Sequence, residues 1–327
     1  MKYNHIIINN VMHYWKNNNR LWAMFNKIFK QNIKDYKAKD LMIKHVITLS
    51  PQENLWKAQN LMSRYNIKKI VIVKEGKKHP IGIMSLKDII KLVISDKTYR
   101  DLHEIPISEA MIRKLVIANK NSAVADCAKT MTENNVSSLI IVNEDDDDNN
   151  SLAGIITTTD FANFFSDNCI SLTSVENYMS QPVFTISIKE KVSTAARIML
   201  EKKVSRLVVI DEDGNQNNSV GIISETDLSL TVPAFKSRTV RMVYEHIGLL
   251  FSSKSKPNFI IEPSFVRIED IMTPNAVPID KDADLAEAAK LMIRRHVSGL
   301  PVIDNADQQP IGITSKSDIV KALTDLA

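Results

Sequence analysis

The sequence predicts an α/β protein, of the α+β type, built from four copies of one β-α-β-β-α unit. Two observations support this fold. A heptad of Gly, two mostly apolar residues, Ser or Thr, two more residues and Asp occurs four times, at 82–88, 154–160, 221–227 and 312–318. Upstream of each heptad, a frame that starts at a Met keeps the same spacing in every copy without a gap. Such self-similarity indicates an array of small repeated units.

The elements of one unit follow from its residue pattern. In the first copy Leu55, Ala58 and Met62 share one helical face, so they predict a helix. The apolar run 70–73 is short and rich in Ile and Val, as in a buried strand. The heptad then starts a second strand, which makes a hairpin with the first, and its Asp is expected to begin another helix. Each unit has about 60 residues, so the units should pair to bury their open faces.

The spacing of the four entry residues Met42, Met111, Met179 and Met272 also sets the expected domains. The last interval is 93 residues, against 69 and 68 before it, so an insertion precedes the fourth copy. We expect a basic, helical N-terminal extension at 1–38, copies at 39–100, 106–170, 174–232 and 265–327, and a linker with a helix at 233–264.

Composition excludes several classes of protein. The chain has 327 residues and a net charge of +4, but residues 1–38 carry seven Lys or Arg and one acid, Asp35. The extension is therefore +6 and the remainder −2, which disfavours a basic nucleic-acid-binding body. Cys127 and Cys169 are too few for a disulfide framework or a metal site, which predicts a reducing, cytoplasmic location. No apolar stretch is long enough to span a membrane.

The extension itself allows two interpretations. Apolar residues at helical spacing, including Leu21, Phe25 and Ile33, are surrounded by Lys and Arg. Such a basic amphipathic helix can meet an anionic membrane or nucleic acid. It can equally dock its apolar face on the first pair of copies.

The unit resembles a CBS domain, the module named after cystathionine β-synthase. The resemblance rests on the Met entries, on stretches such as 136–139, 204–207 and 296–304, and on the four heptads, and it covers nearly all of the chain from residue 38. In that family two units pair with approximate two-fold symmetry into a Bateman module, and the clefts of the module bind AMP, ADP, ATP, S-adenosylmethionine and related ligands. The resemblance implies two such modules here, first copy with second and third with fourth, and implies that the heptad hydroxyl and acid bind ribose.

The chemistry of the heptad agrees with this implication. A ribose diol offers two O–H donors, and a carboxylate is an acceptor that can take both. A helix start also favours a negative charge. The alternative is that Ser or Thr and Asp merely cap the following helix. That alternative explains all four copies less readily, because Asn or Ser would cap as well as Asp.

The copies differ in the residues that could complete a site. The first and third have Thr48 and Thr185 where the family resemblance suggests a contact with the base. They also have cations before the middle strand, Lys68, Lys69 and Arg206, which could bind a phosphate or could be solvated charges. We therefore expect one strong site in each module. The expected nucleotide-binding residues are Thr48, Lys68, Lys69, Ser85, Asp88, Thr157, Asp160, Thr185, Arg206, Ser224, Asp227, Ser315 and Asp318.

The sequence leaves three functions open. It contains no Walker-type loop and no His/Cys cluster, and no part remains for a catalytic domain, so we expect no enzyme, no cofactor and no metal. The first function is a stand-alone regulatory sensor that binds an adenine nucleotide, forms a homodimer as the family suggests, and signals to a protein partner. The second is a ligand-regulated nucleic-acid-binding protein that binds nucleic acid through residues 1–38 and uses the Bateman modules as the ligand switch. The third is an adaptor with vestigial sites.

Overall fold

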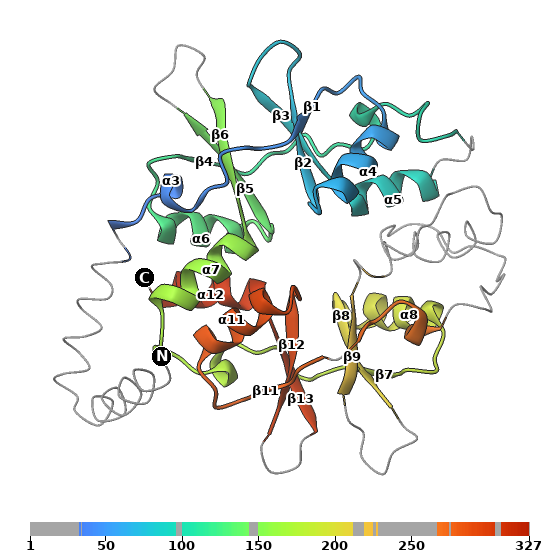
Figure 1. Cartoon of the computed structure of the whole chain (residues 1–327), viewed down its shortest axis with the longest axis vertical. Coiled ribbons are helices and arrows are strands. Elements are labelled where there is room, and N and C mark those ends of the chain that lie inside the picture. Colours follow the sequence, from blue (N-terminus) through green and yellow to red (C-terminus); the bar gives the residue numbers. More distant parts are fainter. Residues whose placement is uncertain are drawn as a thin grey trace.

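Each copy contributes one small sheet with flanking helices to the computed structural model (Figure 1). The structure describes residues 33, 35–95, 100–143, 150–211, 219–224, 227, 267–274, 276–304 and 309–326. The helix expected in the linker 233–264 therefore lies outside the described residues, as does most of the N-terminal extension.

The order of elements in every copy matches the predicted unit as far as the described residues extend. The first copy comprises α3 (Ala38–Leu41), β1 (Thr48–Leu49), α4 (Leu55–Arg64), β2 (Lys69–Val73), β3 (Pro80–Ser85) and α5 (Leu86–Ser95). The second comprises β4 (Ile117–Asn119), α6 (Val124–Glu133), β5 (Ser138–Asn143), β6 (Ser151–Thr157) and α7 (Thr158–Asn168). The third comprises β7 (Thr185–Ser187), α8 (Val192–Lys202), β8 (Arg206–Ile210) and β9 (Ser219–Ser224). The fourth comprises β10 (Thr273–Pro274), β11 (Ile279–Asp280), α11 (Leu285–Arg294), β12 (Gly299–Ile303), β13 (Pro310–Ser315) and α12 (Lys316–Leu326).

The sheets share one topology. In each copy the first strand runs parallel to the middle strand, and the middle strand forms an antiparallel hairpin with the third. The helix between the first two strands covers the sheet with its apolar face; in α4 this face is Leu55, Ala58 and Met62, as the sequence predicts. Asn54 starts this helix by accepting a hydrogen bond from the Lys57 backbone N–H at 2.9 Å.

The second helix of the unit begins earlier than expected. We placed its start at the Asp that closes the heptad, but α5, α7 and α12 each start two residues before that Asp. The Ser or Thr of the heptad therefore precedes the first helical turn, and the Asp is the third residue of the helix. This is the arrangement of a capping box. In a capping box, the Ser or Thr side chain accepts a hydrogen bond from the backbone N–H of the residue three positions later, and the acidic side chain of that residue accepts one from the backbone N–H of the Ser or Thr.

The copies pair first with second and third with fourth, as predicted, and they do so by exchanging their entry segments. Ile43 of the first copy forms a β-bridge to Ile155 in β6 of the second, and Ile112 of the second forms one to Ile83 in β3 of the first. The third and fourth copies exchange Ser180 and the short strand β10 in the same way.

The entry Met and the heptad Gly are in contact at each exchange. This contact explains why both residues recur in all four copies. A Cβ atom placed on Gly154 would lie 2.8 Å from the Met42 sulfur and 2.8 Å from the Ile43 carbonyl oxygen. Equivalent approaches join Gly82 to Met111, Gly221 to Met272, and Gly312 to Met179. The Gly is therefore the residue that lets the partner's entry strand come close to the sheet.

The two modules join through the second and fourth copies. Helix α7 packs on α11 and α12, and α12 also packs on α6, so one continuous core contains Phe161, Phe165, Met292 and Leu323. These four helices lie together between the sheets of the two modules (Figure 1). The described end of the N-terminal extension joins this core. Ile33 is 1% exposed there, which favours the docking interpretation for that residue.

Candidate functional site

The sheet register brings the predicted hydroxyls and cations together. Ser85 at the end of β3 lies directly opposite Lys69 at the start of β2, and Ser224 lies opposite Arg206 in the third copy. Directly opposed residues of an antiparallel pair have Cβ atoms about 5 Å apart. The hairpin of each odd-numbered copy therefore places a hydroxyl and a cation side by side at one end of its sheet.

The four heptad aspartates all bind their own Ser or Thr in the same way. The Oδ2 atom of Asp88 accepts from the Ser85 backbone N–H at 2.8 Å and from the Ser85 hydroxyl at 2.6 Å. Asp160, Asp227 and Asp318 repeat both bonds at 2.6–2.7 Å. The aspartates are thus capping residues, as the alternative interpretation predicts. Among the described residues, no hydrogen bond is found to the other oxygen, Oδ1, of Asp88, Asp227 or Asp318, and all four side chains are half-buried.

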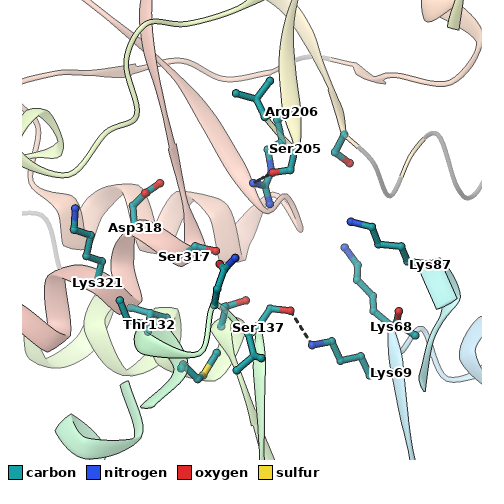
Figure 2. Close-up of a pocket in the computed structure, with 18 of the residues that line it drawn as sticks. Lys68, Lys69, Lys87, Thr132, Ser137, Ser205, Arg206, Ser317, Asp318 and Lys321 are labelled. Carbon is teal, nitrogen blue, oxygen red and sulfur yellow. Dashed lines mark hydrogen bonds between the residues drawn. The ribbon is translucent and has the colours of Figure 1, made fainter. Parts of the chain in front are cut away.

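One cavity of about 840 Å³ lies where the four copies meet. Every copy supplies part of its wall, and Figure 2 shows charged side chains directed into it from both modules. The predicted site residues that line it are Lys68, Lys69, Ser85, Arg206, Ser224 and Asp318. Site residues that were predicted separately for each module therefore line one common cavity.

The cation of each odd copy reaches across to the even copy of its module. The Lys69 amino group donates to the Ser137 hydroxyl at 2.7 Å and to the Ser138 hydroxyl at 2.8 Å (Figure 2). Arg206 donates to the Ser298 hydroxyl at 3.2 Å. Gly299 makes room for this contact, because a Cβ atom there would lie 3.4 Å from the Arg206 side chain and 3.0 Å from the Thr314 carbonyl oxygen.

Burial lowers the pKa values of two lysines in the wall of the cavity, Lys68 and Lys69. The pKa of Lys69 falls to about 8 because its amino group is desolvated, and the negative charge of Asp88 only partly opposes this. Burial also lowers the pKa of Lys68; Asp227 opposes the change and Arg206 adds to it. A bound anion would reverse these shifts, because it would favour the charged amino groups.

The pKa values of the heptad acids in the second and fourth copies are raised rather than lowered. Burial raises the pKa of Asp160, against the bonds from Thr157 and the positive charge of Lys316. Burial likewise raises the pKa of Asp318, against the bonds from Ser315 and the charges of Arg206 and Lys321. Ionising these two carboxylates therefore costs free energy that further donors or cations could recover.

The remaining predicted residues do not line the central cavity. Thr48 pairs with Val71 and Thr185 with Val208, so each Thr is level with a position two residues beyond the cation that starts the middle strand. This places them about 7 Å further along the sheet. Asp88, Asp227, Thr157, Asp160 and Ser315 are likewise not among the lining residues.

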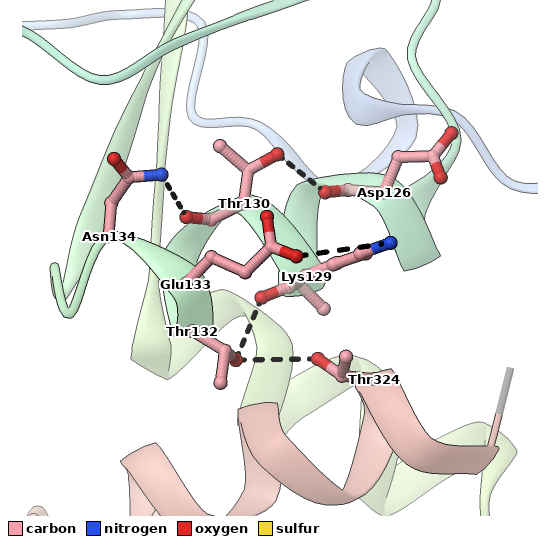
Figure 3. Close-up of polar contacts among 8 residues, drawn as sticks. Asp126, Lys129, Thr130, Thr132, Glu133, Asn134 and Thr324 are labelled. Atoms are coloured by element: carbon pink, nitrogen blue, oxygen red, sulfur yellow. Dashed lines mark hydrogen bonds and ion pairs between the residues drawn. The ribbon is translucent and has the colours of Figure 1, made fainter.

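Sequence reasoning missed several wall residues. Lys87 and Ser317 occupy the sixth position of their heptads and line the cavity, as does Lys203, directly after α8. Thr132 of α6 also lines it, and its hydroxyl lies 3.3 Å from that of Thr324 in α12, across the seam between the modules (Figure 3). The charges Lys87 and Lys203 were visible in the sequence. Only the packing of the two modules shows that both side chains line the same cavity.

Two absences apply to the part of the chain that the structure describes. No group of three or more His, Cys, Asp or Glu residues there is placed to hold a metal ion. No helix there has the length and apolar character needed to cross a bilayer.

The CBS domain profile matches residues 38–95, 107–167, 175–232 and 268–325. These matches cover well over half of the sequence. The chain belongs to the CBS domain family. Its four CBS domains are the four copies described above, paired into two Bateman modules.

Relatives of this CBS protein include two proteins of Methanocaldococcus jannaschii. MJ1404 is 26% identical over 299 residues, which are 88% of this chain and 62% of that protein. MJ1225 is 24% identical over 289 residues, which are 85% of this chain and 95% of that protein. The chain thus spans less than two thirds of the length of MJ1404.

Solved structures share the fold of the whole CBS array. The crystal structure of MJ1225, which is described as a proposed archaeal homologue of γ-AMPK, has a TM-score of 0.68 at 21% identity and covers 88% of this chain and 99% of that one. A conserved protein of Pyrococcus horikoshii has a TM-score of 0.57 at 20% identity and covers 88% of this chain and 100% of its own. At these identities the likeness shows the fold alone.

Proposed function

We propose that this CBS protein is a regulatory receptor for an adenosine-containing ligand: AMP, ADP, ATP or S-adenosylmethionine. One observation carries the proposal. In the first and third copies, a bonded hydroxyl–carboxylate pair lies beside a cation at the edge of a shared cavity. Family membership supports the same ligand class, because CBS pairs bind adenosine ligands in their clefts.

The heptad pair has the hydrogen-bonding character that a ribose requires. The hydroxyls of Ser85 and Ser224 donate to their Asp, so each oxygen has only acceptor capacity left. The Oδ1 atom of the Asp is a further acceptor. Two adjacent ribose hydroxyls are two donors, which these two acceptors match. Capping the helix and binding a ribose therefore use different oxygens of the same carboxylate.

The cations are placed for the phosphate of the same ligand. Lys69 and Arg206 lie opposite the hydroxyl of their own copy and extend to the paired copy. Thr48 and Thr185, further along the sheet, are placed for the base. A phosphate beside Lys69 would restore the charged amino group that burial disfavours. A site of this kind would select phosphorylated ligands over free adenosine.

The exchange of entry segments supports a regulatory role. Each cleft lies between copies that hold each other through a Met and a Gly, so a ligand in the cleft contacts both members of the pair. Its binding energy can shift how they pack, and a protein partner or a second copy of the chain can respond to the change. The description of MJ1225 as a proposed homologue of γ-AMPK points to the same kind of role.

Isothermal titration of AMP and ATP into Asp88→Asn and Asp227→Asn tests the proposal. Each variant keeps an oxygen for the cap but loses the charge and one acceptor. A charge-assisted bond contributes about 1.5–3 kcal/mol, so we expect Kd to rise about 10- to 100-fold. Asp126→Asn is the matched control, because Asp126 is also the third residue of its helix, α6, but is exposed.

Two outcomes contradict the proposal, and a third would favour the alternative in which the ligand controls nucleic-acid binding. Affinity unchanged in both variants would exclude the heptad acids as ribose ligands. A wild-type protein that binds none of the four ligands would favour the adaptor with vestigial sites. A salt-dependent gel shift with nucleic acid that disappears when residues 1–38 are deleted would favour the nucleic-acid regulator.

A further inference from the structure

Sulfur atoms lie at the contacts through which the paired copies hold each other. A Cβ atom placed on the heptad Gly would lie 2.7–2.9 Å from the sulfur of an entry Met in all four copies. Met42, Met179 and Met272 also pack against the hydrophobic cores beside these contacts. Each exchange of entry segments therefore depends on an apolar thioether that touches both the partner's backbone and the margin of a core.

Exposure separates the entry methionines from the other methionines that the structure describes. Met42, Met179 and Met272 are partly exposed. The fourth entry residue, Met111, is buried, with 7% of its surface exposed. The described methionines outside the entry positions are all buried as well: Met62, Met84, Met131, Met199 and Met292. Among the described residues, a small oxidant in solvent therefore reaches methionine sulfur at the exchange contacts before it reaches any other.

We propose that Met42, Met179 and Met272 are oxidation sites, through which hydrogen peroxide loosens the pairing of the copies. The thioether sulfur attacks one peroxide oxygen, and the O–O bond breaks. The leaving hydroxide takes the proton of the transferred hydroxyl and becomes water. The sulfur loses two electrons and becomes a sulfoxide, while the peroxide is reduced. A methionine sulfoxide reductase restores the thioether with two thiols as the reductant, which yields a disulfide and water.

The sulfoxide is a poorer fit to the exchange than the thioether. The Cβ position of Gly154 is 2.8 Å from the Met42 sulfur and 2.8 Å from the Ile43 carbonyl oxygen, so the Gly side of the sulfur has no room for another oxygen. An oxygen on the open side converts an apolar contact at the margin of the core into a polar group that requires hydration. Either epimer of the sulfoxide therefore weakens the contact between the copies.

The second module contains more oxidisable contacts than the first. Both of its entry residues, Met179 and Met272, are partly exposed, whereas the first module combines the partly exposed Met42 with the buried Met111. The Met179 sulfur also accepts a weak hydrogen bond, at 3.9 Å, from the side-chain amide of the exposed Gln181. This sulfur is thus already in contact with a polar group at the surface. Oxidation should loosen the second module before the first.

The first test measures where the oxidant reacts. The full-length protein is treated with hydrogen peroxide, and peptide mass spectrometry follows sulfoxide formation at each methionine. We expect the initial rates at Met42, Met179 and Met272 to exceed the rates at Met84 and Met292 by about tenfold or more. Met111 is the internal control, because it has the same position in the repeat but is buried; it should react as slowly as the core residues. Equal rates at Met111 and Met179 would overturn the assignment.

The second test measures what the modification does to the fold. Leu is close to Met in volume, so a triple variant with Met42→Leu, Met179→Leu and Met272→Leu removes the reactive sulfurs with little change in packing. Oxidation should lower the melting temperature of the wild type by roughly 2–4 °C, and that of the triple variant by less than half as much. Met111→Leu should respond as the wild type does. An equal decrease in the triple variant and the wild type would overturn the proposal.

Two further measurements keep the outcome decisive. Wild-type protein oxidised at Met42, Met179 and Met272, with the buried methionines intact, should already melt at a lower temperature. An unchanged melting temperature in that sample would overturn the proposal whether or not the triple variant folds. Asp88→Asn and Asp227→Asn should show the wild-type rates of oxidation, because the reaction requires no bound nucleotide. A failure of the nucleotide site would therefore leave this inference intact, and the reverse also holds.

Discussion

The odd-numbered and even-numbered copies of the same unit differ in what they contribute to the molecule. The second and fourth copies place their helices in one continuous core, with Phe161, Phe165 and Met292 fully buried. The first and third copies supply the cations that start their middle strands, Lys69 and Arg206. The even copies have Ser138 and Gly299 at the corresponding positions, and serines at or just before those positions accept the hydrogen bonds of the cations.

The same repeat thus makes two kinds of contribution, apolar packing from the even copies and cations at the start of the middle strand from the odd copies. A buried, desolvated cation costs free energy, so it is best tolerated where a neighbouring element supplies compensating stability. The apolar seam of the second and fourth copies is such an element, because large apolar side chains there leave water completely. On the odd side, among the residues that the structure describes, Leu86 at the start of α5 contacts the core of the third copy.

The largest expected effect comes from disrupting the apolar core that the second and fourth copies share. Phe161→Ala should lower the free energy of unfolding by about 3–5 kcal/mol, the usual cost of a Phe cavity in a packed core. Leu86→Ala removes a partly buried side chain at the contact between the first and third copies, and it should lower the free energy of unfolding by about 1 kcal/mol. Urea denaturation of both variants measures the difference. Equal losses of unfolding free energy would show that the contact between the even copies and the contact between the odd copies stabilise the molecule equally.

A smaller effect should follow from filling the entry exchange. Gly154→Ala places a Cβ 2.8 Å from the Ile43 carbonyl oxygen, a backbone atom that cannot move alone. Overpacking of this kind costs about 1–3 kcal/mol. Gly82→Ala meets chiefly the flexible end of Met111, with the nearest backbone oxygen at 3.4 Å, and should cost less. Thermal unfolding of the two variants gives the comparison, and a larger loss for Gly82→Ala would contradict this account of the exchange.

The repeat itself was predictable because the spacing of local features is preserved in every copy. The Met frame, the apolar runs and the heptads predicted the β-α-β-β-α unit, and the resemblance to CBS domains implied the pairing of first with second and third with fourth; the structure confirms both. The start of the second helix was placed two residues late, since Asp was taken as the first helical residue rather than the third. Local patterns also associated Ser85 with Lys69, which the strand register sets side by side.

The contacts between modules were not predictable from the same patterns. Lys316 occupies the fifth position of its heptad, where the other described copies have Leu86 and Thr158, and nothing in that position alone indicates a neighbour in another copy. Its hydrogen bond to Thr159 joins residues 157 positions apart. Long-range placement of this kind depends on how the modules pack, and periodicity within one unit carries no information about it.

A pH dependence of stability should report the protonation of Lys69, the cation of the first copy. The pKa of Lys69 falls from 10.5 to about 8 on folding, so the unfolded chain binds more protons between these values. Stability should therefore rise as the pH is raised from about 8 to about 10.5, by on the order of 2 kcal/mol from this residue. Lys69→Met should remove that rise, whereas Lys57→Met, at an exposed lysine paired with Glu53, should retain it. Urea denaturation at pH 8 and pH 10 measures the slope. An identical slope in wild type and Lys69→Met would mean that Lys69 is not the desolvated cation of the odd copies, because its protonation would then be the same in the folded and unfolded chain.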